Sequence, residues 1–300
     1  MPARASGRRP SREGRAGLAF AAPALFLIFT CFFVPVAAGF FLSLTDFDIY
    51  AIASPDAARW VGVANYRALL ADPVFHKALW NTLYFVLVGG PASVAVSLAA
   101  ALLLASRLAR FPAFYRSVYF APVVTTLVAV AVVWRYLDHP RYGLVNQGLS
   151  LIGIPPIDWL GDPHWAMPAI IVLAVWKNFG YNMLILIAGL QRIPDELYEA
   201  AALDGAGWWA RFRHVTLPGL GPMLLFVSVL TMLGNFQLFA EPYVMTQGGP
   251  LRSTTTLVML MYEEGFRWWR MGHAAAIACL LFVLMLAGTM IQLRLQREAR

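Results

Sequence analysis

The sequence predicts an all-α polytopic membrane protein, and three observations carry this prediction. Apolar residues make up 60% of the chain and charged residues only 13%, whereas soluble domains carry about 25% charged residues. Apolar runs recur along the whole length, and they are long enough to cross a bilayer as helices. No stretch alternates between apolar and polar residues as the strands of a transmembrane barrel do. We therefore expect six transmembrane helices joined by polar loops.

The first span follows a basic segment. Residues 1–16 hold five arginines and one glutamate and are predicted to form a disordered tail. The apolar run 18–44 comes next. A signal peptide is the alternative, favoured by the small residues Ala37, Ala38 and Gly39. The run exceeds the roughly 7–15 apolar residues of a signal peptide and is long enough to span a bilayer. We interpret it as the first transmembrane helix.

Five further apolar stretches alternate with loops rich in polar residues, glycine and proline. The predicted spans cover approximately residues 79–105, 117–137, 165–190, 218–239 and 272–291. The transmembrane domain therefore extends over residues 17–291. A short basic end, 292–300, follows it.

The distribution of basic residues predicts the orientation. The N-terminal tail, the loops 107–116 and 191–217 and the C-terminal end together hold 14 of the 23 Lys and Arg residues. Loops rich in Lys and Arg stay in the cytoplasm. Both termini and the 191–217 loop are therefore predicted to be cytoplasmic, and the net charge of +7 is assigned to topology rather than to nucleic-acid binding.

The motifs of common enzyme sites are absent from the sequence. The only lysines, Lys77 and Lys177, do not lie in a glycine-rich phosphate loop, and no His-Glu-x-x-His, Cys-x-x-Cys or Gly-x-Ser-x-Gly motif occurs. The five histidines are scattered. We expect no catalytic residues, no metal site and no cofactor, so any active transport needs energy from another subunit or from an ion gradient.

The 191–217 loop has the features of two short helices. Pro194 and the two acidic residues after it suit the first turn of a helix over residues 193–203. Asp204 and Gly205 form a stop, because glycine can adopt a left-handed conformation at a helix end and aspartate can cap the next helix. A second short helix is expected over residues 208–212, before the fifth span.

Two interpretations of this loop remain open from its residues alone. The consecutive alanines Ala200–Ala202 leave a smooth surface for a protein partner, and Glu199 offers a carboxylate to an arginine of that partner. Alternatively, the segment is an amphipathic connector at the lipid headgroups, a location that Trp208 and Trp209 would suit.

The spacing in this loop resembles a known family. The pattern Glu199-Ala-Ala-x-x-Asp-Gly-Ala206, followed by Val215-Thr-Leu-Pro218, is similar to the "EAA" loop of binding-protein-dependent ABC importer permeases. Asn81-Thr82 and Thr246-x-Gly-Gly-Pro250 resemble its carbohydrate-uptake branch, which includes the maltose and glycerol-3-phosphate permeases. The resemblance covers about residues 18–290, with a core permease region at about 79–291 and the EAA loop at 191–218. The extra N-terminal helices and large insertion of the maltose permease are absent.

The resemblance implies a type I ABC importer permease fold, in which a cytoplasmic coupling helix docks on a dimeric ABC ATPase. It also implies a second related permease subunit, an extracytoplasmic solute-binding protein and a place in a bacterial or archaeal cell membrane. The residues that match the coupling motif are Glu199, Ala200, Ala201, Asp204, Gly205 and Ala206.

Polar side chains within spans are costly and indicate functional sites. The fourth and fifth predicted spans carry several, with Glu241 at the outer end of the fifth. The resemblance to the maltose permease puts six of them near sugar-contacting positions: Lys177, Asn178, Tyr181, Thr231, Asn235 and Gln237. Amides, hydroxyls and aromatic rings suit a sugar.

Other roles for these polar residues remain open. They can bond neighbouring helices, or satisfy kinked backbone near Gly180 and Gly234. Lys177 can bind an anionic solute or extend to the membrane interface.

The prediction is therefore the permease subunit of an ATP-driven sugar importer. A non-sugar solute such as glycerol-3-phosphate is one alternative. The alternative from another class is an ion-coupled secondary transporter, but such proteins often show inverted repeats and carboxylates within spans. No clear repeat is found here, and the carboxylates lie in loops or at span ends.

Overall fold

The computed structural model describes residues 12–48, 50, 59–106 and 110–298. In these residues the β-structure is one isolated bridge, between Thr45 and Trp60, and the regular structure is otherwise helical. Four helices are long and apolar enough to cross a membrane, and up to six candidate spans result if each of two bent pairs is one span. The all-α prediction is confirmed.

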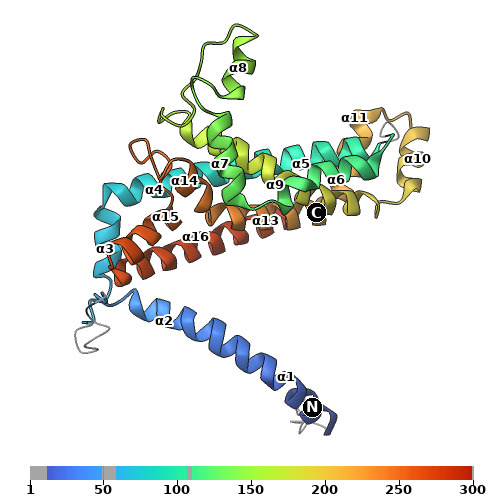
Figure 1. Cartoon of the computed structure of the whole chain (residues 1–300). Coiled ribbons are helices and arrows are strands. Elements are labelled where there is room, and N and C mark those ends of the chain that lie inside the picture. The colour runs from blue at the N-terminus through green and yellow to red at the C-terminus, as the bar shows by residue number, and fades with distance from the viewer. Residues whose placement is uncertain (1–11, 49, 51–58, 107–109, 299–300) are drawn as a thin grey trace.

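The N-terminal helix diverges from the other long helices toward its first residues, whereas its C-terminal part contacts the last long helix, where the Phe40 and Phe282 ring centroids lie 5.9 Å apart (Figure 1). Helix α1 (Arg12–Ile28), a π-helical turn (Phe29–Phe33) and α2 (Val34–Leu42) together include the apolar stretch Gly17–Leu42. None of its most apolar window is buried within this chain. Helix α1 begins at Arg12, inside the segment predicted as a tail, while residues 1–11 lie outside the described residues.

The next candidate span is built from consecutive helical pieces. Helix α3 (Ala64–Ala71) precedes α4 (Pro73–Tyr84), a π-helical turn (Phe85–Gly89) and α5 (Gly90–Ala105). The Asp72 side chain accepts a hydrogen bond from the Val74 N–H at 2.8 Å and so caps α4. This cap and Pro73 at the first position start the span six residues before the predicted boundary at 79.

The third predicted span is broken. Helices α6 (Pro112–Val124) and α7 (Leu127–Leu137) meet at 98°. Thr125 and Thr126, both β-branched, have extended backbone at the break, and Thr125 Oγ1 donates a hydrogen bond to the Pro122 carbonyl at 2.6 Å. The expectation of one continuous helix over 117–137 is therefore wrong.

Helix α9 (Ala166–Leu190) is the central and most buried candidate span; α8 (Leu144–Ser150) precedes it. It packs on α5 and α6. A Cβ atom on Gly180 would collide with the backbone carbonyl of Tyr119 in α6, so the glycine permits close approach of the two helices. Helix α9 is unbroken at this glycine, which therefore marks close packing rather than a kink.

The EAA loop contains α10 (Asp195–Leu203) and α11 (Trp208–Arg211), and the chain continues through a π-helical turn (Phe212–Thr216) into α12 (Leu217–Gly219). The helix from 208 therefore extends to 219, beyond the short helix expected at 208–212. It meets α13 (Gly221–Phe236) at 68°. In Figure 1, α10 and α11 lie toward the same side as both described chain ends.

The remaining helices close the bundle. They are α14 (Ala240–Met245), α15 (Leu257–Tyr262) with a π-helical turn (Glu263–Arg267), and α16 (Met271–Glu298). Helix α16 extends into the predicted C-terminal end at 292–300. The main apolar core lies where α4, α13, α15 and α16 meet, around Phe236, Leu257 and Ile277.

Candidate functional site

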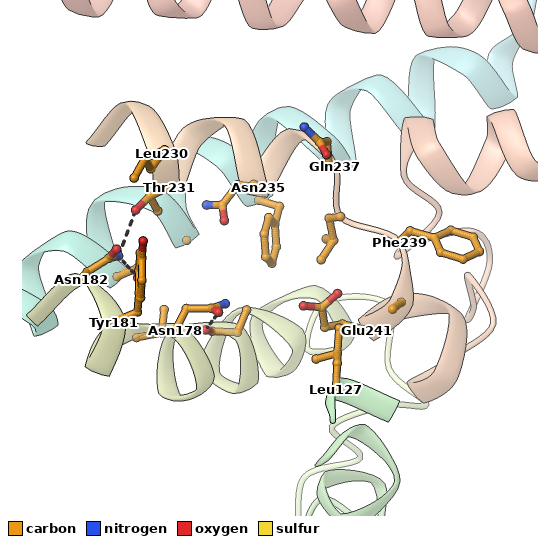
Figure 2. A pocket seen from close by; sticks show the side chains of 18 of the residues that line it. Leu127, Asn178, Tyr181, Asn182, Leu230, Thr231, Asn235, Gln237, Phe239 and Glu241 are labelled. Carbon is orange, nitrogen blue, oxygen red and sulfur yellow. Dashed lines mark hydrogen bonds between the residues drawn. The ribbon is translucent and has the colours of Figure 1, made fainter. Parts of the chain in front are cut away.

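A cavity of about 450 Å³ lies between α9, α13, α14 and the break between α6 and α7 (Figure 2). Its lining combines amide, hydroxyl and aromatic side chains with one carboxylate. The polar and aromatic lining residues are Phe85, Ser93, Asn178, Tyr181, Asn182, Thr231, Asn235, Gln237, Phe239 and Glu241. Five of the six residues predicted for the solute pathway are among them.

Helix α9 contributes three polar residues because its periodicity puts them on one face. Asn178, Tyr181 and Asn182 are three and four residues apart, and such positions share a side of an α-helix. The Asn182 Nδ2 atom donates to Thr231 Oγ1 at 3.0 Å and so joins α9 to α13. Asn178 donates to the Ala174 carbonyl of its own helix at 3.0 Å, and Tyr181 is 48% exposed. Asn182 therefore bonds a neighbouring helix, whereas Tyr181 on the same face of α9 is exposed to the cavity.

The facing wall is formed by α13 and the residues after it. In the amide orientation that satisfies both of its groups, Asn235 donates to the Thr231 carbonyl at 3.3 Å and accepts from the Gly90 N–H at 3.1 Å. Gln237 follows the end of α13 and is exposed. Its amide is therefore available to a solute.

Lys177 does not line the cavity. It is 8% exposed, and its Nζ atom donates to the carbonyls of Pro122 and Thr125, both at 3.0 Å. The last carbonyls of a helix lack partners within that helix and form the negative end of its dipole. Lys177 therefore supplies hydrogen bonds to the C-terminal end of α6, at the point where α6 and α7 separate.

Glu241 is the principal residue that the predicted pathway set omitted. Glu241 lies in the first turn of α14, is 9% exposed and lines the cavity. Figure 2 shows its carboxylate directed toward the space between α9 and α13. The sequence signal was a carboxylate just after the fifth span. Asn182, a lining residue on α9, also lies outside the predicted set.

The second candidate site is the end of α10. Gly205 has a φ of +76°, the left-handed conformation expected from its sequence. The Gly205 N–H donates to the Ala202 carbonyl at 3.1 Å, and the Ala206 N–H donates to the Ala201 carbonyl at 2.9 Å. This pair of bonds is a Schellman motif, which ends a helix at a left-handed residue. Asp204 is the C-cap residue of α10, and the N-cap residue of α11 is Gly207. The expectation that Asp204 caps the second helix is therefore wrong.

The α10 segment is attached to the bundle by one side and exposed on the other. Ile193 is buried, and a Cβ atom on Gly219 would contact its side chain at 2.8 Å. The hydroxyls of Tyr198 and Thr216 lie 3.0 Å apart. Glu199 is exposed and has no ion pair among the described residues. Of the other predicted coupling residues, Ala201 and Ala206 are half-buried, and the exposed ones are Ala200, Asp204 and Gly205.

Curated relatives with similar sequences are transporter permeases. The chain is 37% identical over 279 residues to the probable ABC transporter permease protein YurN of Bacillus subtilis, a match that covers 92% of this chain and 94% of the relative. It is 35% identical over 270 residues to the arabinooligosaccharides transport system permease protein AraP of Bacillus subtilis, with 86% of each chain covered. It is 36% identical over 275 residues to the lactose transport system permease protein LacF of Rhizobium radiobacter, with 90% of each chain covered.

Solved structures share the fold. A chain of a bacterial alginate ABC transporter, in complex with an alginate pentasaccharide-bound periplasmic protein, matches with a TM-score of 0.79 and 20% identity over 96% of each chain. The predicted type I ABC importer permease fold is therefore confirmed as a fold class. A family model for the inner membrane component of binding-protein-dependent transport systems matches residues 15–300. The predicted family is thus confirmed: the chain belongs to the binding-protein-dependent transport system inner membrane components, and its named relatives are permease subunits rather than enzymes.

Proposed function

We propose that this chain is the permease subunit of an ABC importer that moves a sugar or oligosaccharide across the membrane, driven by ATP hydrolysis in a separate subunit. The observation that carries the proposal is the cavity, whose amides, hydroxyls and aromatic rings match the many hydroxyls and the apolar ring faces of a sugar. The names of AraP and LacF, which specify arabinooligosaccharide and lactose transport, support the same solute class.

The solute contacts the polar side chains that face the cavity from α9, α13 and the segment after α13. Asn178, Tyr181 and Gln237 are exposed, so the solute reaches them without displacing a neighbouring helix. Thr231 and Asn235 are half-buried and contribute from the facing wall. Lys177 acts from behind this surface, because its ammonium group is engaged by carbonyls of the α6 end.

Each bent pair forms one span, which makes six spans within residues 17–291. Both termini and the EAA loop, 191–218, lie in the cytoplasm of a bacterial or archaeal cell. Support comes from the 14 basic residues on that side of the predicted topology and from the common side of α10, α11 and the described chain ends in Figure 1. The α1–α2 helix, exposed in this chain, packs against lipid or against a second related permease subunit.

Helix α10 is the coupling helix, seated in a cleft of one subunit of a dimeric ABC ATPase. The exposed Glu199 carboxylate pairs with a basic residue of that cleft, and Ala200 and Ala201 allow close approach. The Gly205 turn sets the angle between α10 and α11. Asp204 and Ala206, the remaining residues of the motif, also contact the ATPase. An extracytoplasmic solute-binding protein delivers the sugar to the face of the permease on the other side of the membrane from the ATPase.

The contacts of α10 suggest how closure of the ATPase reaches the cavity. Ile193 packs on Gly219, and Tyr198 is joined to Thr216, so a displacement of α10 is transmitted to the helix that leads into α13. Helix α13 carries Thr231, which lines the cavity. Movement of α13 against α9 therefore changes the access of the solute to the cavity.

The test is reconstitution of this chain with the ATPase, second permease and binding protein of its own transport system. We expect this chain to co-purify with the ATPase. In proteoliposomes, uptake of a radiolabelled sugar should require ATP on the side of the membrane where the ATPase lies. Arabinotriose, lactose and maltose form the first panel. An assembly that never retains an ATPase would contradict the proposal, and uptake driven by an ion gradient without ATP would support the secondary-transporter alternative.

A further inference from the structure

We infer that Glu241 makes the cavity selective against anionic solutes, so that the transported sugar is neutral or carries an amine. The inference rests on the proposed function and narrows its solute class. It assigns a specificity-determining role to a residue that lies outside the predicted pathway set.

The charge of the cavity comes from one residue. Among its lining residues, all of which lie in the described part of the chain, Glu241 is the one that has an acidic or basic side chain. Its carboxylate is directed into the cavity (Figure 2), and Asn178 and Gln237 are also among the lining residues. The carboxylate accepts a hydrogen bond from its own backbone N–H, and no hydrogen bond from another side chain reaches it in the described residues. It therefore keeps acceptor capacity for a solute.

Lys177 does not give the cavity a positive group. Its ammonium donates to the carbonyls of Pro122 and Thr125, and its side chain lies outside the lining. Burial raises the pKa of Glu241, which lies beyond the candidate spans, while the hydrogen bond from its own backbone N–H and, to a smaller extent, attraction by Lys177 oppose this effect. Lys177 therefore stabilises the Glu241 carboxylate from behind the wall without meeting the solute.

A carboxylate in this position distinguishes solutes by charge. It accepts hydrogen bonds from sugar hydroxyls and attracts an ammonium group, whereas it repels a phosphate or a uronate at short distance in a low-dielectric site. Repulsion of the wrong ligand is an ordinary source of specificity. Glycerol-3-phosphate is thereby disfavoured. The alginate transporter that shares this fold is described as importing an acidic polysaccharide, so the inference separates the two proteins by substrate charge.

The test uses three matched probes derived from a neutral sugar that the complete complex imports. The first is the sugar itself. In the second, one primary alcohol is oxidised to a carboxylate, and in the third an amine replaces that alcohol. Binding to the purified permease–ATPase assembly is measured by equilibrium dialysis at pH 8, without the binding protein, so that the binding protein's own selectivity plays no part.

Glu241→Gln is the informative variant because it removes the charge and retains the shape. Glu263→Gln is the control, since Glu263 pairs with Arg252 at 3.2 Å and does not line the cavity. We expect the unaltered protein to bind the neutral and amine probes at least about tenfold more tightly than the uronate. Glu241→Gln reduces this preference to less than about threefold and weakens amine binding, whereas Glu263→Gln preserves it.

Equal binding of uronate and neutral sugar by the unaltered protein, or an unchanged ratio in Glu241→Gln, overturns the inference and leaves the sugar importer standing. If Glu241→Gln does not assemble, the ratio in the unaltered protein decides, because the repulsion acts there. If none of the sugars in the panel is imported by the complete complex with ATP, the proposed function itself fails and the inference fails with it.

Discussion

The Lys177 Nζ atom lies 3.0 Å from the carbonyl oxygen of Pro122, and this bond joins the middle of α9 to the C-terminal end of α6. A second bond of the same length reaches the Thr125 carbonyl. The only lysine within a predicted span thus satisfies backbone groups that the 98° break leaves without helical partners. A charged donor makes such bonds stronger than a neutral one would.

Replacement of Lys177 by methionine should destabilise the protein. The variant loses two hydrogen bonds from a charged donor, each worth about 1.5–3 kcal/mol at most, so the thermal unfolding midpoint of the purified protein in detergent should fall. Lys177→Arg retains a donor and should lose less. A Lys177→Met variant of normal stability that has lost affinity for an anionic solute would instead identify Lys177 as a solute ligand.

Gly180→Ala should disrupt the packing of α9 on α6. The added methyl group would collide with the Tyr119 carbonyl, which is backbone and cannot rotate away, and overpacking costs about 1–3 kcal/mol. Detergent stability and yield of folded protein measure the effect. Gly39→Ala is the control, because no atom of the described residues, beyond its chain neighbours and its own helix backbone, lies within 4 Å of a Cβ atom there. Similar losses in both variants would refute the steric explanation.

Glu199→Lys should uncouple ATP hydrolysis from transport without changing the fold. Glu199 is exposed and has no ion pair within the described residues, so reversal of its charge breaks no bond inside the chain. We expect normal membrane insertion, and an ATPase rate that the loaded binding protein no longer stimulates. Glu196→Lys makes the same charge change one turn earlier on α10 and is the control. Normal transport by Glu199→Lys would remove the coupling role.

Asp138 should lower the stability of the protein as the pH rises. Burial raises the pKa of this carboxyl to about 6, from an ordinary value of 3.8, and its Oδ2 atom has no hydrogen-bond partner among the described residues. Because the folded pKa exceeds the unfolded pKa, the favourable contribution is complete below about pH 4 and is lost as the pH passes about 6.

Asp138→Asn removes this titration. We expect the variant to be more stable than the unaltered protein at pH 7.5 by about 1–2 kcal/mol, after allowance for screening by solvent. The difference should disappear near pH 4. Thermal unfolding in detergent from pH 4 to 8 measures it, and a difference that does not depend on pH would show that the Asp138 charge is not the cause.

Hydropathy located the helices well where they are continuous and less well where they are interrupted. The fourth span was predicted at 165–190 and is found at Ala166–Leu190. The third was predicted as one helix, because an average over many residues cannot register two extended threonines. Of the six predicted pathway residues, five line one cavity, and the exception, Lys177, faces a helix end that is distant in sequence.

The sequence by itself determined the properties that depend on local composition and backbone geometry. Long apolar runs require helices in a membrane, because unpaired backbone groups are costly there, and Gly205 marks a left-handed helix end because few other residues adopt that conformation readily. Only the tertiary structure decided which polar groups meet. Lys177 is bound to the α6 end and Glu241 faces the cavity because α6, α9 and α14 pack together, and such packing depends on contacts between residues far apart in the chain.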